Sequence, residues 1–284
     1  MARATGAFHF QGYKMGFMHS MPALQWAPSE SATLCYQRTG QGATTPLLLV
    51  HEMGGTSASW AESLPIFGAE RHVIACDLRG AGHSEKIRAA LAVSDFADDL
   101  PPLLDALGCP GPVDVVGVGL GGCIALFLAS RHPARVRRLV PVNPPTHANA
   151  ASGKVLSERA ELADKAGMRA IADATLARSW PPEVMEDGEK YRRYRAQFVT
   201  LDPTSYAYTL RALAGIRFDG VLESIRCPTL FLAGRHDRVR PPAATAEAAA
   251  RVKNAAFREI GAGHVANVQA PAEVAQAVLD FVRP

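Results

Sequence analysis

The sequence predicts an α/β fold in which a mostly parallel, doubly wound sheet is flanked by helices and interrupted by an inserted helical segment. Short apolar runs alternate with helical patterns along most of the 284 residues. Several of these runs are apolar throughout, which is typical of strands buried on both faces of a parallel sheet. Between residues 146 and 218 the alternation stops, and helical patterns continue without a strand between them.

The expected elements follow one another in the order of such a sheet. Strands are predicted at 32–38, 46–50, 73–76, 113–118, 139–142, 229–233 and 256–260. Helices are predicted at 57–67, 94–107, 123–132, 241–253 and 271–282. We therefore expect an N-terminal extension at 1–30, a core made of 31–145 and 219–284, and a helical cap at 146–218.

The composition is that of an ordinary globular protein, with 48% hydrophobic and 20% charged residues. The net charge of +3 is spread without a basic tract, which argues against a nucleic-acid partner. The five cysteines form no C-x-x-C pair and are interpreted as reduced thiols of a cytoplasmic protein. No apolar run approaches the length of a membrane span, and the first 28 residues lack the apolar segment of a secretory signal. No pattern indicates an oligomeric state.

The most informative stretch is Val113–Ala125, VDVVGVGLGGCIA. It reads as a buried strand, a glycine-rich turn and a helix, which is the setting of the nucleophile elbow G-x-S-x-G. An elbow holds its central residue at a strained backbone angle above the sheet, and small neighbours such as Gly117 and Gly121 allow strand and helix to pack closely. The central position calls for Ser, Cys or Asp. Here it is Gly119, which carries no nucleophile.

Two later loops carry the partners that a nucleophile would need. Asp237 follows the strand at 229–233, and His264 ends a Gly-Ala-Gly-His turn after the strand at 256–260. Because loops at the carboxyl ends of parallel strands meet at one sheet edge, we expect both side chains to lie near Gly119, beneath the cap. His264 is then a general base, and Asp237 fixes its tautomer. The alternatives are a surface histidine and a turn-capping aspartate.

In this order of elbow, acid and histidine, the chain resembles the α/β-hydrolases from residue 32 to 282. The cap stretch 167–180, GMRAIADATLARSW, and the loop 51–55, HEMGG, resemble 3-oxoadipate enol-lactonases and related small carboxylesterases. Gly119 departs from the family, which has serine there, and Glu52 stands where many relatives carry glycine. The resemblance implies hydrolysis of a small ester or lactone, with a small-molecule substrate and with no cofactor or metal.

The resemblance also implies an oxyanion hole made of two backbone N–H groups. Leu120, which follows the nucleophile position, would supply one, and Met53 the other. Glu52 is interpreted either as a bystander that points into the structure or as a substrate-binding acid or base beside the pocket.

The cap would supply the walls of the pocket. By resemblance, Trp180 is the expected aromatic substrate contact, and a core anchor between cap helices is its alternative role. Arg178 and Arg195 would either meet a substrate carboxylate or be solvated.

Other chemistries are disfavoured. Cys123 lies one helical turn beyond Gly119 on a core helix and is interpreted as an inert buried thiol. Ser84 ends a structural turn. The glycines at 117–122 match a dinucleotide-binding pattern only loosely, because no acidic residue follows at a suitable strand end. No His, Cys, Asp and Glu cluster has metal-ligand spacing in the sequence.

Three hypotheses explain the glycine at position 119. The first is a serine hydrolase inactivated by the change of its nucleophile to Gly119. The second is an enzyme that naturally lacks the serine and uses the His264–Asp237 dyad as a base for direct hydrolysis, lyase chemistry or cofactor-free oxygenation. The third is a non-catalytic protein that binds a small molecule in the capped pocket.

Overall fold

The computed structural model describes residues 22–29, 31–41, 45–147, 150–185 and 188–283. The strands are β1 (Gln25–Pro28), β2 (Thr33–Thr39), β3 (Leu47–Val50), β4 (Val73–Cys76), β5 (Val113–Val118), β6 (Val136–Val142), β7 (Thr229–Gly234) and β8 (Ala255–Ile260). They form one sheet of order β1-β2-β4-β3-β5-β6-β7-β8. Only the β1–β2 and β2–β4 pairs of this sheet are antiparallel, so the predicted mostly parallel sheet is confirmed.

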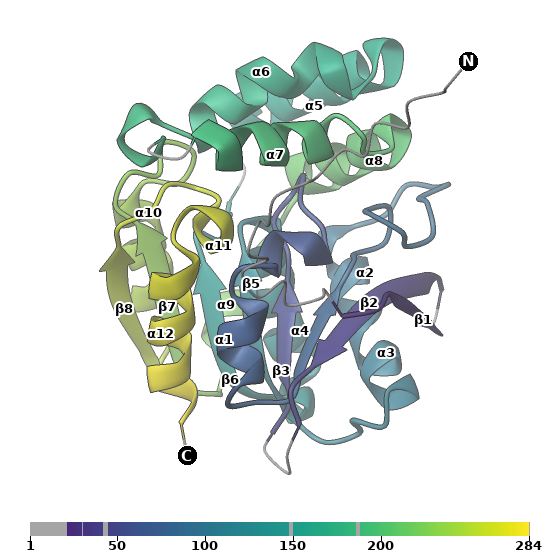
Figure 1. Cartoon of the computed structure of the whole chain (residues 1–284). Coiled ribbons are helices and arrows are strands. Elements are labelled where there is room, and N and C mark those ends of the chain that lie inside the picture. The colour runs from purple at the N-terminus through teal and green to yellow at the C-terminus, as the bar shows by residue number, and fades with distance from the viewer. Residues whose placement is uncertain (1–21, 30, 42–44, 148–149, 186–187, 284) are drawn as a thin grey trace, which may run out of the picture.

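Helices cover both faces of the sheet (Figure 1). The α-helices of the core are α1 (Leu64–Gly68), α2 (Val93–Asp98), α3 (Leu100–Ala106), α4 (Leu120–Arg131), α9 (Val221–Ser224), α10 (Pro242–Ala250), α11 (Ala266–Gln269) and α12 (Pro271–Val282). Short 3-10 helices lie at η1 (Ser57–Trp60), η2 (Pro133–Arg135) and η3 (Pro182–Val184).

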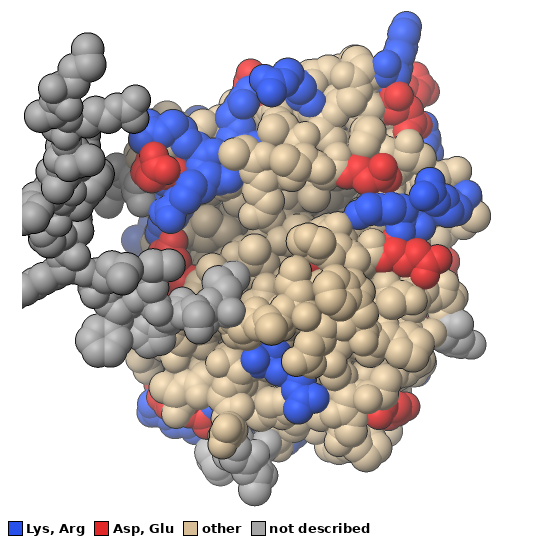
Figure 2. Space-filling view, turned by 45° about the vertical axis from the view of Figure 1, so that its right-hand side comes forward, with Lys and Arg blue, Asp and Glu red and all other residues tan. Residues whose placement is uncertain are grey.

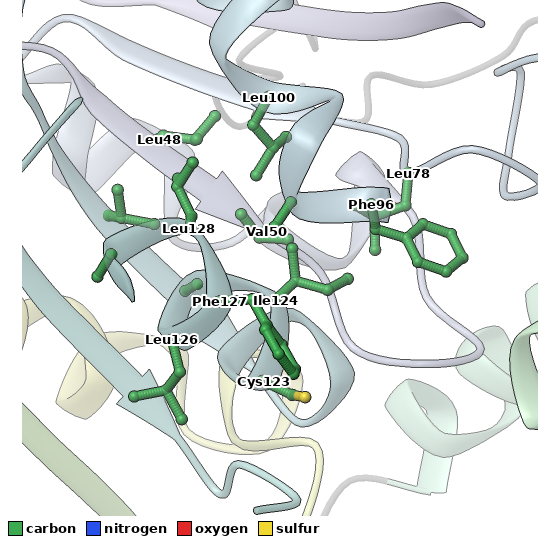
Figure 3. Close-up of a cluster of buried hydrophobic side chains, with 14 of the residues drawn as sticks. Leu48, Val50, Leu78, Phe96, Leu100, Cys123, Ile124, Leu126, Phe127 and Leu128 are labelled. Atoms are coloured by element: carbon green, nitrogen blue, oxygen red, sulfur yellow. The ribbon is translucent and has the colours of Figure 1, made fainter. Parts of the chain in front are cut away.

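Alternate side chains of the central strands enter two separate apolar clusters. Leu48 and Val50 of β3 pack with helices α2, α3 and α4 in the first cluster, and Figure 3 shows them facing Ile124 and Leu128 of α4. Leu47 of β3 packs with α1 and α12 on the opposite face. Since successive residues of a strand point to opposite faces, the uninterrupted apolar runs follow directly from burial on both sides.

The segment between β6 and β7 is helical, as predicted. It contains α5 (Ala150–Ala166), α6 (Met168–Ser179), α7 (Gly188–Phe198) and α8 (Pro203–Ala214), which we call the cap helices. They lie across the end of the sheet at which the parallel strands finish (Figure 1). A third apolar cluster holds them together and also includes Val265, from the loop after β8.

Besides the short helices α9 and α11, which were not expected, and the earlier starts of α4 and β6, the structure differs from the expected elements at three places. Gln25–Pro28 forms β1 and pairs with β2, although these residues were assigned to an N-terminal extension; the rest of the extension, 1–21 and residue 30, lies outside the described residues. The helix expected at 57–67 is split into η1 and α1, and the helix expected at 94–107 is split into α2 and α3. Both second halves begin with proline in the first turn, where its missing N–H is tolerated.

Within the described ranges, no helix is long and apolar enough to cross a membrane. The expected cytoplasmic location stays a prediction.

Candidate active site

The backbone at Gly119 has the geometry of an elbow. Its φ is 53° and its ψ is −118°, a conformation that side chains other than glycine rarely adopt without strain, and its N–H donates to the Val142 carbonyl at 2.8 Å. The neighbours must be small: a Cβ at Gly121 would lie 2.3 Å from the Val50 carbonyl oxygen, and one at Gly117 would lie 2.1 Å from the Gly121 oxygen. The expectation that glycines permit close packing of strand and helix is confirmed.

Position 119 itself is open. A Cβ placed there would lie 3.4 Å from Nε2 of His264 and 3.5 Å from the Cβ of Glu52, which are van der Waals distances. A serine at this position therefore fits the surrounding atoms and starts beside the ring nitrogen of a base.

His264 and Asp237 form the pair expected from their order in the chain. Nδ1 of His264 lies 2.8 Å from Oδ2 of Asp237, and the other carboxylate oxygen accepts the N–H groups of Val239 at 2.7 Å and Arg240 at 2.8 Å. The Asp237 side chain is fully buried, and that of His264 is 17% exposed. Because the carboxylate accepts the Nδ1 proton, the neutral ring presents the lone pair of Nε2 towards position 119.

The loop that carries His264 is anchored by side chains that the sequence did not single out for this role. Buried Asn143, at φ 49°, donates from Nδ2 to the carbonyls of Gly263 at 2.9 Å and His264 at 3.1 Å. Its Oδ1 accepts the N–H of Gly234 at 2.8 Å. Gln269 accepts the N–H of Gly263 and donates to the Ser179 carbonyl at the end of α6, which links this loop to the cap.

Two N–H groups are available where an oxyanion hole is expected. Leu120 is the first residue of α4, and the first N–H groups of a helix have no partner within it. Met53 lies in the loop after β3. In the part of the chain that the structure describes, the N–H groups of Leu120 and Met53 donate to no acceptor. Both residues line the same cavity as His264. The partial positive charge of the α4 N-terminus favours a developing oxyanion there.

His51 fixes the direction of the Met53 N–H. Its Nε2 accepts the N–H of Leu78 at 3.0 Å, so Nδ1 carries the ring proton and donates to the Glu52 carbonyl at 2.8 Å. The Glu52 carbonyl and the Met53 N–H belong to one planar trans peptide and point in opposite directions. The hydrogen bond that fixes the carbonyl therefore also fixes the direction of the Met53 N–H.

Glu52 is buried, and its carboxylate points into the structure. Oε1 accepts the hydroxyls of Ser59 and Tyr194, each at 2.9 Å, and Oε2 accepts Nδ2 of Asn267 at 2.9 Å. Burial, and next the neighbouring Glu52 carboxylate, raise the pKa of Tyr194 well above its ordinary value. These contacts join the loop after β3 to cap helix α7 and to α11, and Glu52 does not line the cavity beside His264. They favour the structural interpretation of Glu52.

Trp180 lies in the interior of the cap. Its ring is buried and packs against Tyr191 and Tyr194, with both centroid distances at 5.6 Å. It does not contribute to the cavity beside His264. The packing favours the core-anchor alternative over a substrate contact.

The cavity beside His264 has a volume of about 100 Å³ and lies between core and cap. Arg159 from α5, Arg178 from α6 and Arg240 from the loop after Asp237 contribute to its walls. Arg195, expected as a possible carboxylate contact, instead pairs with Asp173 at 2.8 Å on the surface of the cap. In the space-filling view, most basic side chains on this face lie in its upper half, on the side of the cap (Figure 2).

The structure gives no support to Cys123 or Ser84 as a replacement nucleophile. Cys123 is fully buried, and burial raises the pKa of its thiol well above the ordinary value. Ser84 is buried and donates to the Asp77 carbonyl at 2.6 Å. The fold does bring one possible ligand atom each of Cys35, Asp77 and His83 within 4.8 Å of one another.

The donor set of this cluster does not suit a cation. One carboxylate oxygen of Asp77 accepts the Ser57 N–H and the other accepts the His83 N–H. Burial and then the Asp77 charge raise the pKa of Cys35 to about 11, whereas a metal ligand must be a thiolate.

Sheet order, elbow and histidine–aspartate pair together define a protein of the α/β-hydrolase class. The family model described as the alpha/beta hydrolase fold matches residues 45–271, and the chain belongs to this family. The predicted fold class is thereby confirmed.

Among particular relatives, a Variovorax paradoxus protein assigned as the carbamate hydrolase RutD is 30% identical, covering 88% of this chain and 96% of its own. The 3-oxoadipate enol-lactonase 2 of Acinetobacter baylyi is 25% identical, over 86% of this chain and 90% of its own. The crystal structure of the enol-lactonase from Burkholderia xenovorans LB400 superposes with a TM-score of 0.86 at 27% identity, covering 91% of this chain and 99% of that one. The structure of a malate-bound esterase from Thermogutta terrifontis superposes with a TM-score of 0.85 at 26% identity, covering 92% of this chain and 98% of that one. The resemblance to small ester and lactone hydrolases is confirmed.

Proposed function

We propose that this chain carries the site of a small carboxylic ester or lactone hydrolase, impaired because Gly119 replaces its serine nucleophile. The observation that supports this most directly is the open position at Gly119, whose Cβ would lie 3.4 Å from Nε2 of His264. The retained His264–Asp237 hydrogen bond of 2.8 Å supports the same interpretation. Relatives named as esterases and enol-lactonases support the choice of substrate class.

With serine at position 119, each residue has a defined step. The serine oxygen attacks the substrate carbonyl while Nε2 of His264 takes its proton, and the N–H groups of Met53 and Leu120 bind the oxyanion. Asp237 stabilises the imidazolium. His264 then protonates the leaving alkoxide, and a water molecule, deprotonated by the same nitrogen, releases the acid and restores the serine.

A second candidate is direct hydrolysis by the chain as it stands. The space left by the absent side chain lies beside Nε2 of His264, where a water molecule could be activated. That water attacks the carbonyl and gives its proton to Nε2, and the same proton passes to the leaving alkoxide when the tetrahedral intermediate collapses. The intact His264–Asp237 pair favours this candidate over a purely binding role, because binding alone requires neither residue.

The test compares the chain with Gly119→Ser on small esters and enol-lactones, together with labelling by a fluorophosphonate followed by intact mass. Losing the nucleophile of a triad costs about a millionfold in turnover, so the serine variant should be faster by several orders of magnitude and should alone be labelled. A glycine form that is the faster of the two and depends on His264 would favour direct hydrolysis. Ligand binding without turnover in either form, indifferent to His264→Ala, would favour the binding protein.

A further inference from the structure

Cap helix α7 lies directly on the segment that carries Met53. Four of its side chains, at positions 190, 194, 197 and 198, have the spacing of one helix face and contact residues 52–62. Three of these contacts are hydrogen bonds: Lys190 donates to Glu62 at 3.0 Å, Tyr194 to Glu52 at 2.9 Å and Gln197 to Thr56 at 2.8 Å. The Lys190 pair lies at the surface, where such pairs add little, whereas Tyr194, Glu52 and Thr56 are buried.

The fourth contact reaches the residue directly after Met53. Gly54 has a φ of 93°, and a Cβ placed on it would lie 2.8 Å from two carbons of the Phe198 ring. Real side chains do not tolerate such a distance, so the ring packs against the bare backbone of Gly54. Helix α7 therefore presses on the loop at the point where the Met53 N–H is presented.

The atoms that bind α7 also hold the loop together. Oγ1 of Thr56, which accepts from Gln197, accepts the Ala58 N–H at 3.2 Å as the cap of η1. Oε1 of Glu52, which accepts from Tyr194, also accepts the Ser59 hydroxyl at 2.9 Å. Ser59 in turn accepts the Thr56 N–H at 3.2 Å. Tyr194 and Gln197 thus act on one closed set of hydrogen bonds between residues 52 and 59.

Helix α7 is less firmly attached to the core than its neighbour α8. Ala212 and Leu213 of α8 belong to the first apolar cluster of the sheet. The described residues of α7 enter neither sheet cluster, and only Tyr194 and Phe198 enter the cap cluster. Cavities of about 520 and 200 Å³ flank α7, and Gln197 lines both. The row of contacts with residues 52–62 is therefore a main attachment of this helix.

We propose that α7 is a clamp on the oxyanion hole, in which Tyr194 and Gln197 are positioning residues that fix the Met53 N–H through Glu52 and Thr56. His51 holds the same peptide from the core side, and α7 holds its loop from the cap side. The substrate carbonyl meets a complete oxyanion hole only while α7 is docked. The effect on turnover rests on the function proposed above, whereas the hold on the loop does not.

Hydrogen–deuterium exchange followed by mass spectrometry tests the hold on the loop in the unaltered chain, without any reaction. One hydrogen bond of ordinary strength changes an opening equilibrium about fivefold. We expect peptides covering residues 47–62 to exchange about fivefold faster in Tyr194→Phe and in Gln197→Ala, and faster still in the double variant.

Steady-state kinetics in Gly119→Ser test the positioning role. An oxyanion donor acts on the transition state and not on the bound substrate, so the double variant should lower kcat while KM stays within about twofold. Complete loss of one donor costs about 10²–10³-fold in kcat, and a loosened donor should cost about tenfold.

The matched control is Ser130→Ala, which removes one half-buried hydrogen bond, to Ser224 at 2.6 Å, between α4 and α9. It should leave exchange at residues 47–62 and kcat unchanged, as should Arg192→Gln, whose partner Glu189 lies on α7 itself. Unchanged loop exchange in the double variant, or an equal rise in Ser130→Ala, would refute the clamp. A kcat within twofold of Gly119→Ser would refute the positioning role. If Gly119→Ser hydrolyses nothing, the proposed function fails and the exchange rates alone decide the clamp.

Discussion

The two sides of the candidate site are held in place by different means. On the base side, His264 donates a side-chain hydrogen bond to Asp237, and its loop is held by Asn143 and Gln269. On the nucleophile side, the elbow at Gly119 is shaped by backbone contacts and by the lack of side chains at its neighbours. The comparison teaches that the backbone shape of the elbow does not depend on a nucleophilic side chain at position 119. A nucleophile can therefore be missing while the geometry for it remains.

The strongest test of the base side is Asp237→Asn in whichever form of residue 119 is active. Asparagine can present its amide N–H to His264 and so stabilise the wrong tautomer, and in serine hydrolases such a change lowers kcat about 10⁴-fold. Steady-state kinetics measure the effect. Glu183→Gln, which removes only the exposed partner of Arg238, should leave kcat unchanged. A loss of less than tenfold in Asp237→Asn would remove Asp237 from the dyad.

Substitutions at the elbow should lower the free energy of unfolding. Gly121→Ala places a Cβ 2.3 Å from the Val50 carbonyl, where backbone must move, and we expect a loss of about 3 kcal/mol or more in the free energy of unfolding. Gly119→Ala makes no contact closer than 3.4 Å, so only the strain of a positive φ remains, about 1–2 kcal/mol. Urea denaturation compares the two variants, and equal losses would contradict the view that contacts at Gly121 set the elbow.

The loop of His264 offers a smaller effect. Asn143→Ala leaves the Gly234 N–H and two carbonyls without their buried partner, which costs about 2 kcal/mol. The free energy of unfolding should fall by this amount, and activity should fall with it. Asn254→Ala removes an exposed hydrogen bond to the Arg226 carbonyl and should change stability by no more than about 0.5 kcal/mol.

The smallest effect concerns the loop after β3. Tyr194→Phe removes one of the hydrogen bonds to the buried Glu52 carboxylate and should lower the free energy of unfolding by about 1 kcal/mol. Tyr191→Phe on the same helix is the control, because its ring packing against Trp180 is preserved. Should both variants match the unaltered chain, the Glu52 contacts would have no measurable part in holding this loop.

The fold and the pairing of His264 with Asp237 were predictable because strands, and the loops that follow them, are set by local sequence. The breaks in two helices were equally local, since Pro65 and Pro101 mark them. Strand β1 was not predictable: four residues become a strand only through pairing with β2.

Of the three arginines that line the cavity beside His264, Arg178 was singled out from the sequence, whereas Arg159 and Arg240 were not. Arg159 and Arg240 are more than 80 positions apart in the chain, and only the packing of the cap on the core brings them to one cavity. The roles of His51 and Asn143 likewise depend on partners distant in sequence. The position of each directly after a strand was the one signal available.

The ring of His51 has a consequence for spectroscopy. It is buried, Nε2 accepts a hydrogen bond and the Nδ1 proton is donated to the carbonyl that orients Met53. A proton held in this way exchanges slowly with water and gives a separate, downfield-shifted resonance. The chain therefore contains its own magnetic-resonance reporter of the loop after β3, which can follow this loop in the glycine and serine forms without an added label.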